Sequence, residues 1–455
     1  MKEAGFRLKI CGLLFNLSGT PWIPFFLNIP MKSKLFCLIL FLAPLSLIAQ
    51  KNFDDYFTSG VFRFDYLLSG TSNTVKVTEV QQKKEPFWGG TLHLSTNAPT
   101  LGNYRFNVKD QVTGTLLFRQ GFSPLFQEWQ ATAEAKKMER AFYQVLRFPF
   151  PKNKVVVEIE CRNREGHFEK IYSTDIDPFN YFITKELPVK NDFSVLRKSG
   201  DPSKKVDLAI LAEGYKKEEM DKFVKDATRL TDSLFTVEPF FSLKDEFNIY
   251  ALKTPSEESG TDIPGRNIYL NTLYSSSFYT FNIARYLTLT DMKTVHDQAA
   301  SVPYDYVIVL VNSSEYGGGG FYNFVSVCTV DNFFAPKVFI HEFGHEFAGL
   351  ADEYYTSEVA YEDFYNLKIE PWEPNLTTMV DFKSKWGALI DPTTPVPTPR
   401  TAKYEKKTGV FEGGGYMTKG IYSPTQDCRM KSNKPNSFCP VCQEAIRKAI
   451  LKCTE

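Results

Sequence analysis

The motif HEFGH at 341–345 constrains this chain more than any other stretch. Side chains four positions apart lie on one face of an α-helix, so His341 and His345 can present both imidazoles to one metal ion. Glu342 follows the first histidine and can reach a water molecule bound to that metal. An apolar run precedes the motif, and Gly349 can end the helix because glycine enters the left-handed conformation at no steric cost. The stretch therefore predicts a helix over 338–348 that carries a metal site.

Two imidazoles and a neighbouring carboxylate are typical of a catalytic zinc site. Zinc takes neutral nitrogen ligands, and its open position holds a water whose pKa falls to about 7. Glu342 would take a proton from that water during attack on a polarised carbonyl, and would pass it to the leaving amine. The alternative is two histidines on a solvated helix face beside a glutamate in a salt bridge. The chain has only five histidines, and two lie in this motif, which favours the metal site.

A catalytic zinc ion usually has three protein ligands, so the motif needs one more. Beyond the glycine that ends the helix, the chain can return a side chain beneath the histidines. Asp352 is the first acid in that position, and Glu353 is the alternative; their spacing alone does not separate them. The predicted metal ligands are therefore His341, His345 and Asp352, with Glu342 as general base and acid.

The length and composition predict a globular protein of more than one domain. A chain of 455 residues is too long for one ordinary hydrophobic core. Hydrophobic residues make up 43% of it, which is ample for burial. Basic and acidic residues are equal at 53 each, and no long basic tract is present. Nothing in this composition points to nucleic acid or to an anionic membrane surface as a partner.

A predicted N-terminal domain spans 51–188. Apolar and polar residues alternate at 62–66, 104–109 and 155–162, and turn-forming sequences separate these runs. Short strands at such spacing predict an antiparallel β-sandwich. One helix is expected near 131–144. No catalytic cluster is visible, so we expect a role in binding, shielding or positioning, or as a stabilising scaffold.

A polar stretch at 185–205 marks the predicted boundary to a second domain at 189–455, where the pattern changes. Strands alternating with helices predict an α/β layer on which the motif helix packs. A glycine quartet at 317–320 is expected to be flexible. The other expected elements are strands at 206–211, 247–252, 306–311 and 321–329, and helices at 220–234 and 442–451.

Residues 31–50 read as a secretory signal. Two lysines precede an apolar run of about fifteen residues that ends in a small residue, and cleavage is expected after Ala49 or Gln50. Residues 1–30 fit poorly before such a signal, so we expect Met31 to be the true start. The run is short for a transmembrane helix. We expect a secreted, periplasmic or cell-surface protein without an integral membrane segment after processing.

Two further metal sites are open alternatives. Four cysteines gather near the C-terminus, Cys428, Cys439, Cys442 and Cys453. An oxidising exterior favours disulfides among them, and a structural Cys₄ zinc site is the alternative. The loop at 256–262 is rich in acids and hydroxyls, so it is a candidate for calcium, with a solvated loop as the alternative.

At these residues the chain resembles metzincin-type zinc peptidases, and more closely the bacterial IgA-peptidase family of metallopeptidases. The resemblance covers roughly 190–455 and implies a metzincin-like α/β peptidase domain behind an N-terminal β-domain. The matching segments are HEFGHEFAGLADEY at 341–354, GGGGFYNFVSVCTVD at 317–331, GVFEGGGYMTKGIYSPTQDCRM followed by FCPVC within 409–442, VDLAILAEGY at 206–215 and SEESGTD at 256–262.

The resemblance also bears on individual residues. The metzincin pattern has glycine three residues after the second histidine; here it follows at four, and Asp352 keeps the family's interval from glycine to the third ligand. The resemblance therefore favours Asp352. It implies a methionine turn beneath the metal, for which Met430 comes first and Met417 second. Tyr416 and Tyr422 are candidates to replace the family's tyrosine. The strand at 321–329 would border the cleft, where an extended substrate could add to it.

We therefore predict an α+β multidomain protein with an N-terminal antiparallel β-sandwich and a metzincin-like α/β zinc-peptidase domain. The predicted function is that of a secreted zinc endopeptidase acting on proteins or peptides. The alternative is a secreted binding or adhesion protein with a vestigial metal site. The intact motif argues against it, because a relic has no need to keep Glu342.

Overall fold

The computed structural model describes residues 52–96, 101–185, 191–355 and 364–454. The predicted signal at 31–50 and the predicted start at Met31 lie outside these residues. No helix among the described residues is both long enough and apolar enough to span a bilayer. Residues 52–455 form one compact unit, and the domain boundary at 188/189 stays a prediction.

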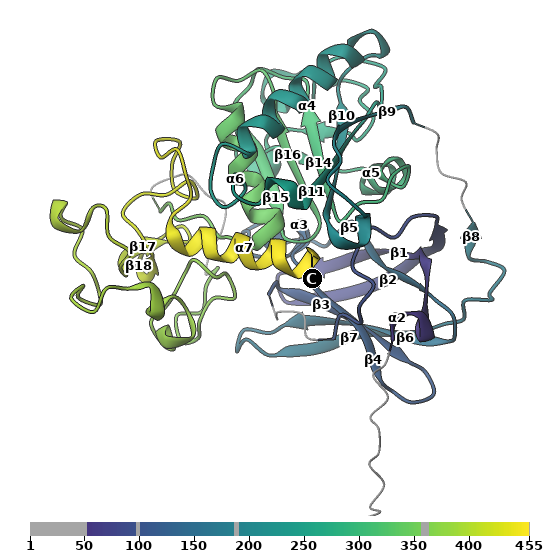
Figure 1. The fold of residues 1–455 in the computed structure, drawn as a ribbon, viewed down its shortest axis with the longest axis horizontal. Coiled ribbons are helices and arrows are strands. Elements are labelled where there is room, and N and C mark those ends of the chain that lie inside the picture. The colour runs from purple at the N-terminus through teal and green to yellow at the C-terminus, as the bar shows by residue number, and fades with distance from the viewer. Residues whose placement is uncertain (1–51, 97–100, 186–190, 356–363, 455) are drawn as a thin grey trace, which may run out of the picture. The chain divides into compact units, whose positions relative to one another are not determined.

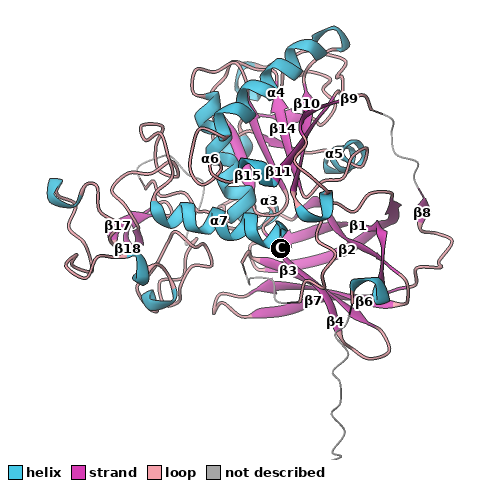
Figure 2. Ribbon diagram, viewed as in Figure 1, coloured by secondary structure: helices cyan, strands magenta, loops and turns pink. Residues whose placement is uncertain are grey.

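The N-terminal part contains two four-stranded sheets, drawn in magenta in Figure 2. One has the order β5-β1-β2-β8 and the other the order β4-β3-β6-β7. Neighbouring strands are antiparallel except β2 and β8, which are parallel. The strands are β1 (Phe57–Thr71), β2 (Thr74–Glu85), β3 (Tyr104–Asp110), β4 (Leu116–Phe122), β5 (Arg140–Pro151), β6 (Val155–Arg162), β7 (Phe168–Ile176) and β8 (Thr184–Lys185). Two short helices are α2 (Phe53–Tyr56) and α3 (Leu125–Gln130).

One aromatic core joins these two sheets. Phe62 and Phe64 of β1 and Phe148 of β5 share a buried cluster with Phe106 of β3 and Ile159 of β6. The alternation seen in the sequence is therefore confirmed as strands. The helix expected near 131–144 is wrong, because α3 ends before it and β5 begins inside it. Pairing of β5 with β1 along most of its length outweighs the local helix propensity.

The second face of the β1 sheet is also covered. Arg63 and Asp65, which alternate with the core residues, are fully buried. The Arg63 guanidinium lies 2.7 Å from Asp65 and 2.6 Å from Asp297 of helix α5 (Met292–Ala299). Burial alone would raise the pKa of Asp297, but Arg63 and neighbouring lysines hold it at about 2. This buried ion pair joins the N-terminal sheets to the second half of the chain.

The second half is built on a six-stranded sheet of order β15-β16-β14-β10-β11-β9. The four central strands run parallel, and both edge strands are antiparallel. The strands at 206–211, 247–252 and 306–311 are confirmed. The single strand expected at 321–329 is wrong in its extent. The segment 318–329 forms a hairpin of two strands, and glycines of the quartet lie in the first strand, at the edge of the sheet. The strands are β9 (Phe193–Arg197), β10 (Val206–Glu213), β11 (Phe247–Leu252), β14 (Tyr306–Val311), β15 (Gly318–Phe321) and β16 (Val325–Thr329).

Helices cover both faces of this sheet (Figure 1). Side chains of α4 (Met220–Leu234), α6 (Ala335–Ala348) and α7 (Pro440–Thr454) form a core with one face. Helix α5 packs on the other face. The predicted helices at 220–234, 338–348 and 442–451 are confirmed, and the last begins two residues earlier. Short pairs of strands complete the fold, β12 (Ser276–Ser277) with β13 (Thr288–Leu289), and β17 (Phe411–Gly414) with β18 (Met417–Ser423).

Candidate metal centre

Helix α6 carries the HEFGH motif and ends where the sequence predicts. Gly349 caps it in the left-handed conformation, with φ of 62°. The helix is held to the sheet by Glu346, whose carboxylate accepts hydrogen bonds from the Val307 N–H at 3.1 Å and the Ser326 hydroxyl at 2.6 Å. Burial raises the pKa of Glu346 to about 8. Sequence reasoning missed this anchor, although an acid set among apolar residues beside His345 was its signal.

The three predicted ligands lie together, with His341 and His345 on α6 and Asp352 in the turn beyond it. The Nε2 atoms of His341 and His345 are 3.1 Å apart. Asp352 Oδ1 lies 3.0 Å from the first Nε2 and 3.4 Å from the second. Each imidazole is fixed from behind, because its Nδ1 lies against a backbone carbonyl, that of Arg429 at 3.0 Å and that of Leu350 at 2.5 Å.

This arrangement fits a divalent metal ion. A carbonyl only accepts, so each Nδ1 carries the hydrogen, and a neutral imidazole then directs its Nε2 lone pair toward the other ligands. Three acceptor atoms face one another, and zinc with bonds of about 2.0–2.1 Å would separate two such atoms by about 3.3 Å. Burial alone would raise the pKa of Asp352, but the imidazoles hold it well below its usual range. Burial lowers the pKa of His345, but the Asp352 carboxylate raises it to about 9, so the metal-free imidazole holds a second proton that a bound cation would replace. The group therefore attracts positive charge.

Glu342 lies between this group and the edge strand β15. Burial raises the pKa of Glu342 above its usual value. A Cβ at Gly318 would lie 2.8 Å from the Glu342 side chain, and a Cβ at Gly320 would lie 2.3 Å from the Glu342 carbonyl. The glycine quartet is therefore not the flexible segment that the sequence predicted. It is the part of the sheet edge that lets α6 approach closely.

Asp352 and Glu353 separate into different environments. Asp352 faces the two histidines, whereas Glu353 Oε1 lies 3.4 Å from the Cys442 sulphur and accepts a hydrogen bond from the Asn375 side chain at 3.0 Å. The Glu353 N–H donates to the Met430 carbonyl at 2.8 Å. Spacing alone left these two acids equivalent, and the fold distinguishes them.

The residues proposed for a methionine turn also separate. Met430 is fully buried, and a Cβ at Gly344 would lie 3.0 Å from its sulphur, so Met430 packs against α6 between the two histidines. Met417 instead packs with Leu376 and Ile421 in a separate small cluster. Met430, and not Met417, therefore packs against the helix that carries the two histidines, and the methionine turn stays a prediction.

Of the two candidate tyrosines, Tyr416 belongs to the site. Its hydroxyl donates to Asp352 Oδ2 at 2.6 Å. Tyr422 lies in β18, where its backbone pairs with Thr377. The Arg285 guanidinium lies 3.4 Å from the hydroxyl of Tyr354, which also lines the site. Tyr416 therefore orients the carboxylate that faces the histidines.

The group opens into a cavity of about 340 Å³. Strand β15 borders it, so the edge of the sheet there is β15 and not the longer strand that was predicted. Tyr286 makes one bridge to this edge at Gly318. The N-terminal part contributes to the wall, and the Tyr286 hydroxyl donates to the Glu128 carboxylate. Residues from that part are Asn103, Ser123, Gln127 and Glu128.

The cysteines do not form the predicted disulfides. All six in the described part of the chain are free, and the Cys428 and Cys442 sulphurs are 3.9 Å apart. The alternative site of four cysteines is also wrong, because it includes Cys453. Cys453 lies eleven residues beyond Cys442 on α7, which carries it about 16 Å away. The carboxylate of Glu353 takes its place beside the other three.

The loop at 256–262 uses its acids internally. Asp262 accepts a hydrogen bond from the Leu270 N–H at 2.7 Å, and Glu258 accepts one from the Asn271 N–H at 2.6 Å. Within the described residues, two groups of at least three His, Cys, Asp or Glu side chains could hold a metal, and neither includes this loop. Both acids are therefore engaged by backbone N–H groups, and the choice between a calcium site and a solvated loop stays a prediction.

Comparison with known proteins identifies the family. A family model described as IgA Peptidase M64 matches residues 195–404 and 400–450. The chain belongs to the IgA Peptidase M64 family. A second model, described as Peptidase M64 N-terminus, matches residues 52–173, so both halves of this M64 chain are represented. No curated protein matches it. The resemblance seen in the sequence is confirmed, and the M64 match includes Glu342 and all three predicted ligands.

Proposed function

We propose that this member of a peptidase family is a secreted, zinc-dependent endopeptidase. The observation that carries the proposal is the meeting of three ligand atoms, from His341, His345 and Asp352, beside Glu342 in an open cavity. Three protein ligands leave one position for water or substrate, which is the arrangement of catalytic rather than structural zinc. The metzincin-like and β-sandwich assignments belong to the same proposal.

A zinc ion held by this group would supply Lewis acidity and would lower the pKa of a bound water to about 7. The residues of the chain then have separate roles. Glu342 accepts a proton from the attacking water and delivers it to the leaving amine nitrogen; its raised pKa suits a group that must do both. The carbonyls of Arg429 and Leu350 orient the imidazoles. Tyr416 orients Asp352.

The substrate we propose is an extended stretch of protein chain. Strand β15 is an edge strand beside Glu342, and edge strands pair readily with extended peptides. The bridge from Tyr286 occupies the edge at Gly318, which directs a peptide toward the part that ends at Phe321. Side chains from the N-terminal part would contact such a peptide, which gives that part a positioning role.

Secretion is part of the proposal and rests on the signal at 31–50. N-terminal sequencing of protein exported by a producing cell tests it. A mature chain beginning at Gln50 or Lys51 is the expected result. A mature chain that retains residues 31–50 would contradict it.

The main test replaces Glu342 by glutamine. Glu342→Gln keeps the shape and the metal ligands but removes the proton acceptor, so hydrolysis of casein, of immunoglobulin A and of a quenched-fluorescence peptide library should fall by about 10²–10⁴-fold. Metal content and unfolding temperature should not change. Glu444→Gln, on the exposed side of α7, is the matched control. Undiminished cleavage by Glu342→Gln would refute the mechanism. A parent protein that binds zinc and cleaves none of these substrates would favour the binding-protein alternative.

A further inference from the structure

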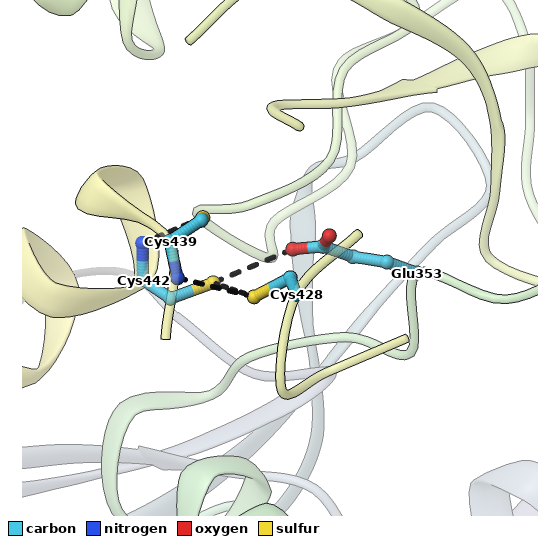
Figure 3. A group of neighbouring side chains, drawn as sticks. All are labelled: Glu353, Cys428, Cys439 and Cys442. Carbon is cyan, nitrogen blue, oxygen red and sulfur yellow. Dashed lines mark hydrogen bonds between the residues drawn. The ribbon is translucent and has the colours of Figure 1, made fainter. Parts of the chain in front are cut away.

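A second group of ligand-type side chains lies behind the first. Glu353, Cys428, Cys439 and Cys442 offer one ligand atom each, and these atoms all lie within 4.8 Å of one another. All four residues are buried. They come from three places in the chain: the turn beyond α6, the loop after β18, and the start of α7. Figure 3 shows the Cys428 and Cys442 sulphurs and the Glu353 carboxylate turned toward one another.

The spacing matches ligands around one ion. The Cys428 and Cys442 sulphurs are 3.9 Å apart, and Cys442 Sγ lies 3.4 Å from Glu353 Oε1. A disulfide would need about 2.05 Å between the sulphurs. Tetrahedral zinc, with bonds of about 2.3 Å to sulphur and about 2.1 Å to oxygen, separates two sulphurs by about 3.8 Å and a sulphur from an oxygen by about 3.6 Å. Both observed distances agree with the second geometry.

Backbone donors already point at the sulphurs. The Cys439 N–H donates to Cys428 Sγ at 3.2 Å, and the Cys442 N–H donates to Cys439 Sγ at 3.5 Å. Hydrogen bonds from N–H groups favour a negatively charged sulphur, which is the form that binds a metal. The short spacing of Cys439 and Cys442 at the first turn of α7 brings two ligands from one segment.

The carboxylate lacks sufficient compensation within the protein. Glu353 is fully buried, and its Oε2 has no hydrogen-bond partner among the described residues. Its Oε1 accepts two hydrogen bonds from neutral donors, the Asn375 amide at 3.0 Å and the Cys442 thiol at 3.4 Å. No ion pair within 4.0 Å involves Glu353 in the described part of the chain, and an uncompensated buried charge is strongly destabilising. A bound cation would provide the missing positive charge.

We propose that Glu353, Cys428, Cys439 and Cys442 form a second, structural zinc site. Four protein ligands complete a tetrahedron and leave no position for water, so the site takes no part in hydrolysis. Thiolate ligands select zinc over magnesium and calcium. The alternatives are a metal-free cluster of hydrogen-bonded thiols and a disulfide formed after rearrangement, and the experiment below separates them.

The second site would hold the first in place. Glu353 follows Asp352 directly, and Cys428 precedes Arg429, whose carbonyl accepts the His341 hydrogen bond. Zinc bound between these segments and the start of α7 would hold both Asp352 and the Arg429 carbonyl in position. The inference does not depend on catalysis, because the metal can be counted in an inactive protein.

The experiment counts zinc in the full mature chain carrying His345→Ala, which weakens the first group. We expect about one zinc atom per chain to remain, and about two in the parent. Adding Cys442→Ser to His345→Ala should reduce the count to about zero. Adding Cys161→Ser to His345→Ala is the matched control, because Cys161 lies in the N-terminal sheets. It should leave the number of zinc atoms per chain unchanged. A His345→Ala protein with no zinc after reconstitution would overturn the proposal.

A cobalt measurement covers the possibility that Cys442→Ser fails to fold. Co²⁺ bound by three thiolates gives intense charge-transfer absorption in the near ultraviolet, which imidazole and carboxylate ligands do not give. We expect this band in the parent and in His345→Ala. Its absence from both would overturn the proposal, as would a disulfide among the three cysteines found by mass spectrometry of the unreduced protein.

Discussion

Asp352 and Glu353 are neighbours in the chain, yet each joins a different group of ligand-type side chains. Asp352 joins two histidines that remain 17% and 15% exposed at the edge of a cavity. Glu353 joins three buried cysteines, of which only Cys439 keeps any exposure, at 6%. The first group therefore has access for water and substrate, and the second has none.

This difference in access points to different roles for the two groups. Three ligands with an open position suit catalysis, whereas four ligands without one suit structural stabilisation. The two groups are also joined through the backbone, since the Glu353 N–H donates to the Met430 carbonyl and the preceding Arg429 carbonyl accepts from His341. Loss of the first group should change rate, and loss of the second should change stability.

Replacing Asp352 by alanine should have the largest effect. Asp352→Ala removes a ligand, so hydrolysis should fall by well over 100-fold, more than the 10–100-fold loss typical of an outer-shell change. The unfolding temperature should change little, and about one zinc atom should remain per chain. Activity assays and zinc analysis check this. If Glu353→Ala abolished activity and Asp352→Ala did not, the roles assigned to the two acids would have to be reversed.

Breaking the buried group should act on stability. Cys442→Ser or Glu353→Gln leaves a closed group incomplete, which we expect to cost about 3–5 kcal/mol, comparable to breaking a buried ion pair. For a folded unit of about 400 residues that corresponds to a fall in the unfolding temperature of roughly 4–6 °C. Calorimetry with zinc present measures it, with Cys161→Ser as control. Unchanged stability of both variants would mean that the group does not stabilise the fold.

The first group could be predicted because it is local. His341, His345 and Asp352 lie within twelve residues, and helical geometry with a glycine stop determines how they meet. The strands β10, β11 and β14 were predictable for a related reason, since a buried parallel strand appears as a continuous apolar run. Local periodicity contains this information.

The second group could not be predicted because it is formed by the fold. Glu353 and Cys428 are 75 residues apart, and nothing between them indicates that they meet. Pairing of cysteines by proximity in the sequence wrongly included Cys453, which the rise of α7 carries away. Arg63 and Asp65 show the same limit, because their alternation with apolar residues does not reveal that α5 covers the second face.

Removing the Tyr416 hydroxyl tests how the first group is oriented. Tyr416→Phe deletes the 2.6 Å hydrogen bond to Asp352 and keeps the ring, so kcat/KM should fall by about 10–100-fold while the fold is retained. Zinc affinity, measured by competition with a chelator, should fall with it. Tyr422→Phe on β18 is the matched control and should behave like the parent. Equal losses in both variants would assign the effect to the hairpin and not to Asp352.

Replacing Met430 by leucine should have the smallest effect. The sulphur packs against Gly344 beneath the histidines, and leucine fills nearly the same volume, so Met430→Leu should cost less than about 1.5 kcal/mol in unfolding free energy. Activity should stay within a few-fold of the parent, because packing and not sulphur chemistry supports the helix. Gly344→Ala places a Cβ 3.0 Å from that sulphur and should cost more. A large loss of zinc affinity in Met430→Leu without loss of stability would instead give the sulphur an electronic role at the open group, and would narrow the difference between the two groups.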